Sequence, residues 1–157
     1  MEVSLVLLFI ALLAIGYLTK RRYGLLAAGV LFGYLLSVNA SQIVTSQIET
    51  QGIKLESPPL LLVTGVALVL LPSIILAFVG PIHNKTHHRW IAAFGYAVTG
   101  VFLSLLSIAQ NAPSMIAMKS FFGDMIDYRS IILVIIILFA LVDLFMIHRP
   151  KHRKKEK

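Results

Sequence analysis

The sequence predicts an all-α, polytopic membrane protein with about five transmembrane helices. Of its 157 residues, 58% are apolar and only 13% are charged, and the mean hydropathy is +0.87. An ordinary soluble domain has about 25% charged residues, because its surface needs polar cover. The apolar residues are also grouped into five separate segments. Composition and grouping together exclude a soluble globular protein.

The five apolar segments form one domain, residues 1–147, followed by a basic tail, residues 148–157. The expected spans are 3–19, 24–38 (with an alternative end at Val44), 60–80, 90–109 and 131–147. Seventeen helical residues cover about 25 Å, whereas a bilayer core is about 30 Å thick, so the first, second and fifth spans are near the short limit. The third span is the longest, and the second is the least well defined because glycines dilute it.

Charges in the connecting segments predict the orientation. Eleven cations lie on one side of the expected membrane, and three lie on the other. The first group is Lys20, Arg21, Arg22, Lys85, Arg89, Arg149, Lys151, Arg153, Lys154, Lys155 and Lys157, and the second is Lys54, Lys119 and Arg129. The positive-inside rule places the larger group in the cytoplasm, giving an N-out/C-in topology. The first span is expected to be a retained anchor, because its cations follow it, whereas those of a signal peptide precede the apolar stretch.

Two outer connecting segments have the spacing of amphipathic helices. In residues 39–52, Ile43, Val44 and Ile48 recur at helical spacing, and Gly52 is expected to end that helix. In residues 113–127, apolar residues repeat three to four positions apart, with Asp124 and Asp127 on a more polar side. The second segment is expected either to lie on the outer leaflet or to pack on the ends of the spans.

Two residues within the expected spans are candidates for an intramembrane function. Asp143 is the only acidic residue inside a span, and an ionisable group in hydrocarbon is costly, so it is a functional candidate by default. It lies about one turn from the cytoplasmic end, where it could pair locally instead. Pro72 interrupts the third span, as in the broken helices of transporters, but the absence of a second break favours a structural kink.

Small residues gather in the second and fourth spans. Small residues allow membrane helices to approach closely, so these two spans are expected to be packing helices. The helix-packing candidates are Gly29, Gly33, Ala93, Gly95, Ala97 and Gly100. The cations Lys20, Arg21, Arg22, Arg149, Lys151, Arg153, Lys154 and Lys155 are expected to face anionic lipid headgroups.

Catalytic and metal-binding motifs are not recognisable. The chain contains no cysteine, and we find no nucleophile–base set, phosphate-binding loop or metal-ligand motif. We therefore expect a non-enzymatic protein without a cofactor, metal or nucleic-acid partner, which associates with itself or with a membrane-protein complex. The alternatives are a channel or transporter subunit with a path near Pro72 and Asp143, and an enzyme that uses Asp124 and Asp127.

The order of features resembles the colicin V production (CvpA) family of bacterial inner-membrane proteins over residues 1–128. The similar stretches are the turn Lys20-Arg21-Arg22-Tyr23-Gly24 leading into a second span, the glycine-bearing segment from Arg89 to Gly100, and the Ser/Pro-containing segment that follows. The resemblance implies a bacterial inner-membrane location and a role in toxin production or export and in envelope maintenance. It implies no chemistry for any residue.

Overall fold

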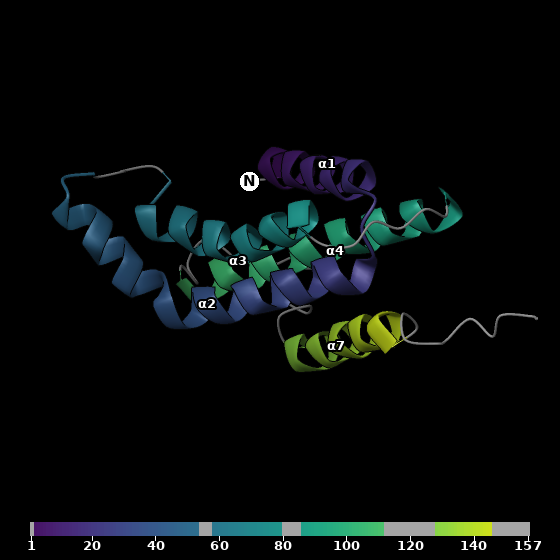
Figure 1. Cartoon of the computed structure of the whole chain (residues 1–157). Coiled ribbons are helices and arrows are strands. Elements are labelled where there is room, and N and C mark those ends of the chain that lie inside the picture. Colours follow the sequence, from purple (N-terminus) through teal and green to yellow (C-terminus); the bar gives the residue numbers. More distant parts are fainter. Residues whose placement is uncertain (1, 54–57, 80–85, 112–127, 146–157) are drawn as a thin grey trace, which may run out of the picture.

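The computed structural model describes residues 2–53, 58–79, 86–111 and 128–145, and the elements in these ranges are α-helices (Figure 1). The amphipathic candidate at 113–127 and the basic tail lie outside the described residues. The helices are α1 (Glu2–Thr19), α2 (Tyr23–Thr50), α3 (Leu60–Val79), α4 (Thr86–Asn111) and α7 (Arg129–Phe145). All five correspond to the apolar segments expected from the sequence.

Helices α2, α3 and α4 form the core of the bundle. Helix α1 packs on α4 and α7 packs on α2, at opposite edges of the core in Figure 1. Contacts between residues show that α2 and α3 are antiparallel, because Gly29 meets Ser73 and Gly33 meets Val69. Helix α1 is antiparallel to α4, because Gly16 meets Ala93 and Leu12 meets Gly100, and α2 is parallel to α4, because Ser37 pairs with Ser107 and Ser41 with Asn111. The end of α7 lies at the start of α2, so successive helices alternate in direction, as in a polytopic membrane bundle.

Within the described residues, three helices are long and apolar enough to cross a membrane: α2, α3 and α4 from Trp90 onward. The apolar stretch of α1, Val3–Thr19, is shorter, and α7 has 17 residues. The expectation that α1 and α7 are short agrees with these lengths. The protein is thus a helical, membrane-integral protein with three clear candidate spans.

Helix α2 joins two segments that the sequence analysis expected separately. A span was expected at residues 24–38, with an alternative end at Val44, and a second helix in residues 39–52, whereas α2 runs without a break for 28 residues to Thr50. The amphipathic pattern of residues 39–52 is a continuation of this helix, because the polar side chains there keep helical spacing. Gly52 ends it as expected, with a φ of +89° that favours glycine.

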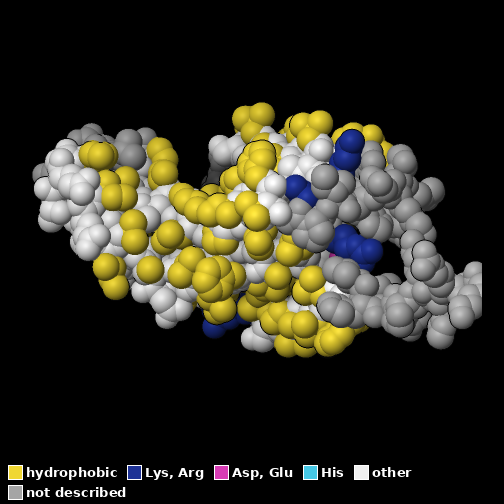
Figure 2. Space-filling view, viewed as in Figure 1, with side chains coloured by type: hydrophobic (Ala, Val, Ile, Leu, Met, Phe, Trp, Pro, Cys, Tyr) yellow, Lys and Arg dark blue, Asp and Glu magenta, His cyan; other side chains and the backbone are white. Residues whose placement is uncertain are grey.

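The buried core contains apolar side chains from the three central helices, from α1 and from α7. Helix α4 is the most enclosed, since 67% of its most apolar 18 residues are buried, against 50% for α2 and 39% for α3. The largest buried apolar side chains include Leu12, Leu26, Val69, Tyr96 and Leu103. The outer faces are also apolar, and hydrophobic side chains spread over the face shown in Figure 2. Such a surface suits a lipid environment.

Candidate functional site

The small residues of α2 lie where α2 and α3 touch. A β-carbon added at Gly29 would lie 2.7 Å from Ser73 Cα, and one at Gly33 would lie 2.6 Å from Leu68 O. Pro72 cannot donate a backbone hydrogen bond to Leu68, so this carbonyl lacks its usual helical partner. Gly33 allows the backbone of α2 to approach this part of α3 closely.

The small residues of α4 face α1 and the start of α2. Ala93 and Ala97 are fully buried, and a β-carbon added at Gly16 of α1 would lie 3.0 Å from Ala93 Cα. Gly95 lies under the Tyr23 ring, and Gly100 lies against Leu12. The small-residue faces predicted to mediate packing are therefore occupied by helices of the same chain.

Asp143 binds the start of α2. Its Oδ2 atom accepts a hydrogen bond of 2.8 Å from the Gly24 backbone N–H. The first N–H groups of a helix have no partner within the helix, so a carboxylate there satisfies a free donor and interacts favourably with the helix dipole. A β-carbon at Gly24 would lie 2.6 Å from Ala140 O, so the absence of a side chain lets α7 approach. The structure thus gives Asp143 a hydrogen-bond partner in another helix, 119 positions away in the chain, whereas the residues after Phe145 with which it could pair locally lie outside the described residues.

Pro72 and Asp143 lie on different helices, α3 and α7. Next to Pro72, Ser73 Oγ donates a hydrogen bond of 2.7 Å to Leu70 O and shares one of 2.9 Å with the Tyr96 hydroxyl. Helix α3, which carries Pro72, and α7, which carries Asp143, each pack on α2. The two residues proposed for a transport path therefore each lie beside an intrachain contact that links helices.

A polar cluster that the sequence analysis missed lies between α2 and α4. Ser37 Oγ and Ser107 Oγ are 2.6 Å apart and buried, and Ser41 Oγ donates a hydrogen bond of 3.3 Å to Asn111 Oδ1. Gly65 of α3 leaves room for these groups. The sequence does carry a pattern that could have predicted this cluster. Polar residues of α2 repeat every four positions, and polar residues of α4 lie on one face of that helix: Ser37, Ser41 and Thr45, and Ser104, Ser107 and Asn111.

Arg21 is bound to the end of α3. Its Nε donates to Ala77 O and its Nη2 to Phe78 O, both at 2.8 Å. These carbonyls belong to the last turn of α3, where cations are favoured. The guanidinium predicted to face lipid headgroups thus fixes the α1–α2 turn to α3, while Lys20 in the same turn is exposed. The headgroup candidates of the tail lie outside the described residues.

The outer face of α1 has a regular seam. Its residues are spaced by three and four positions, and all of them are exposed. They are Ser4, Leu7, Ala11, Ala14 and Leu18. This is the heptad spacing at which two helices pack side by side, and serine and alanine let backbones come close. We call this set the α1 seam.

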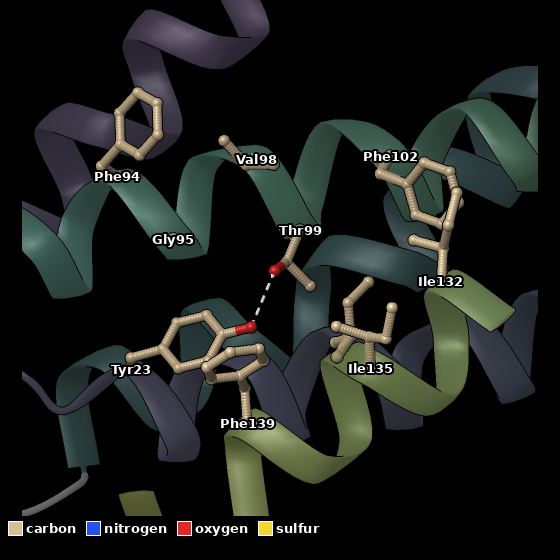
Figure 3. A pocket seen from close by; sticks show the side chains of 10 residues that line it. Tyr23, Phe94, Gly95, Val98, Thr99, Phe102, Ile132, Ile135 and Phe139 are labelled. Carbon is tan, nitrogen blue, oxygen red and sulfur yellow. Dashed lines mark hydrogen bonds between the residues drawn. The ribbon is translucent and has the colours of Figure 1, made fainter. Parts of the chain in front are cut away.

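An apolar groove lies between α4 and α7, with the start of α2 at one end (Figure 3). Its volume is about 290 Å³. Its lining is Tyr23, Phe94, Gly95, Val98, Thr99, Phe102, Ile132, Ile135, Ile136 and Phe139. Among the described residues, no group of three or more His, Cys, Asp or Glu side chains could hold a metal ion.

These features define a helical, membrane-integral protein held together by close backbone contacts and interhelical hydrogen bonds. No protein-family model, curated protein or solved structure matches the chain.

Proposed function

We propose that the chain is a non-enzymatic, five-span inner-membrane protein that acts by associating through its helices, with itself or with a membrane-protein complex. The alternating helix directions and the cation pattern support five spans with the N-terminus outside. Lys20, Arg21 and Arg22 lie where α2 begins, beside the ends of α3 and α7, and the basic tail follows α7. The positive-inside rule then puts this end of the bundle in the cytoplasm.

The α1 seam is the observation that carries the association part of the proposal. Between helices in a membrane there is little hydrophobic driving force, because lipid is as apolar as the side chains. Association therefore depends on close packing at small residues. The small residues of α2 and α4 already pack against other helices of the same chain, whereas Ala11 and Ala14 in the α1 seam are exposed.

Single-cysteine cross-linking tests self-association directly, because the chain has no cysteine of its own. With Ala11→Cys, two seams in contact bring the β-carbons within the roughly 4 Å that a disulfide needs. The matched control is Ile10→Cys, which is 56% exposed but turned about 100° around the helix. We expect a disulfide-linked dimer from membranes containing Ala11→Cys and little from Ile10→Cys.

Purification in mild detergent tests association with other proteins. A co-purifying membrane protein that is lost when Ala11 and Ala14 are changed to Leu supports the proposal. Equal cross-linking of Ala11→Cys and Ile10→Cys, together with a monodisperse monomer in detergent, contradicts it. The CvpA resemblance and its implied role in toxin production or export stay predictions, which the gene neighbourhood of the chain can test.

A further inference from the structure

The α4–α7 groove exists because α7 is docked on α2 and not on α4. Gly24 and Asp143 hold the end of α7 against α2, and Ile136 and Ala140 are the buried residues of α7. Helix α4 packs on the other side of the start of α2, where Gly95 meets Tyr23. The groove remains between α4 and α7. It follows α4 from Phe94 to Phe102, which is about 12 Å at 1.5 Å per residue.

The chemistry of this groove calls for an apolar occupant. Its polar side chains are Tyr23 and Thr99, and their hydroxyl oxygens are 3.1 Å apart in a hydrogen bond with each other (Figure 3). The rest of the lining is aromatic, aliphatic or glycine. The two hydroxyls partly satisfy each other, and the lining has no other polar side chain and no charged one, so its surface favours an apolar occupant.

A flexible hydrocarbon chain fits this groove better than a transmembrane helix does. A partner helix needs small residues for close approach or polar groups for hydrogen bonds. Here the one glycine is covered, since an added β-carbon at Gly95 would lie 2.9 Å from the Tyr23 ring. Bulky side chains line both walls, and Phe94 and Phe139 stand out at 57% and 65% exposure. An acyl chain can adapt its shape to such an irregular apolar surface.

Cations at the Tyr23 end of the groove favour an anionic headgroup. Arg22 directly precedes Tyr23, and Lys20 is exposed two residues earlier. Figure 2 shows Lys and Arg side chains gathered around the end of the bundle where α2 begins. Within the described residues Arg21 is bound to α3, whereas no hydrogen bond or ion pair is found for the side chains of Lys20 and Arg22.

We propose that the α4–α7 groove binds one acyl chain of an anionic phospholipid, with the headgroup at Lys20 and Arg22. The proposal rests on the membrane location but not on the α1 seam, so the two can fail separately.

Native mass spectrometry of the full chain tests this proposal with two probes, dioleoylphosphatidylglycerol and dioleoylphosphatidylcholine. Ile135→Trp fills the groove from a position that is 47% exposed, so the fold should tolerate it. The matched control is Ile137→Trp, which is 42% exposed on the same helix but outside the groove lining. Val98→Trp fills the groove from the opposite wall.

We expect a one-to-one adduct with phosphatidylglycerol in the wild type. Ile135→Trp and Val98→Trp should weaken it about tenfold, and Ile137→Trp should leave it intact. Lys20→Gln and Arg22→Gln should each lower the preference for phosphatidylglycerol over phosphatidylcholine about fivefold. An adduct unchanged by both groove-filling variants overturns the proposal. So does equal binding of the two lipids, or a protein dimer that Ile135→Trp dissociates while lipid binding is unchanged.

Discussion

Replacing Gly33 by alanine should separate α2 from α3. The new methyl carbon would lie 2.6 Å from Leu68 O and 2.7 Å from the Val69 carbonyl carbon, and closer still to Val69 O. Favourable contact needs about 3.5 Å, so the two backbones must move apart by roughly 1 Å. Overpacking costs about 1–3 kcal/mol, and a clash with backbone atoms, which cannot rotate away, belongs to the upper part of that range, about 2–3 kcal/mol; alanine's helix propensity offsets about 1 kcal/mol of it. We expect a net loss of about 1–2 kcal/mol.

Gly100→Ala is the matched control for this prediction. Its methyl carbon would meet Leu12 Cδ1 at 2.6 Å, but that atom is the end of a flexible side chain and can turn away. Reversible unfolding in mixed micelles measures the free energy of unfolding of both variants. We expect Gly100→Ala to lie within about 0.5 kcal/mol of the wild type. If Gly33→Ala is as stable as Gly100→Ala, the close approach of α2 and α3 does not stabilise the bundle.

Three further predictions concern the hydrogen bonds between helices. Asp143→Ala should release the Gly24 N–H, which speeds the hydrogen exchange of that group and lowers the free energy of unfolding by about 0.5–2 kcal/mol. Asp143→Asn should retain most of the stability, because asparagine also caps helices well. Equal exchange at Gly24 in both variants would argue against the cap. In a double-mutant cycle, Ser37→Ala and Ser107→Ala should couple by about 0.6 kcal/mol in the free energy of unfolding, and a coupling of zero would mean that the two hydroxyls do not interact. Arg21→Gln should lower the melting temperature more than Arg22→Gln does, because only Arg21 binds the end of α3; the reverse order would contradict that role.

The sequence predicted helix positions well where local signals mark the ends. Residues 60–80 were expected as a span, and α3 covers Leu60–Val79, because Pro58 and Pro59 fix its start. Gly52 was likewise expected to end a helix and does so. The continuity of α2 was not expected, because the polar residues after Val38 were interpreted as a separate helix outside the membrane. A helix can continue beyond the apolar core, and polarity alone does not end it.

Contacts between helices could not be predicted from local patterns. Asp143 was recognised as unusual, but its partner Gly24 is 119 positions away, and only the docking of α7 brings them together. The small residues of α2 and α4 were recognised as packing residues, yet whether they pack within the chain or between chains depends on tertiary structure. The Ser37–Ser107 pair was missed because a single serine in an apolar helix carries little signal until the facing helix is known.

The central claim is that the chain crosses the membrane five times, with its two ends on opposite sides. Reporter fusions at both termini test it most directly, with alkaline phosphatase, which is active only outside the cytoplasm, and green fluorescent protein, which is fluorescent only inside it. The account predicts phosphatase activity for the N-terminal fusion and fluorescence for the C-terminal fusion. Both ends on the same side of the membrane would contradict it.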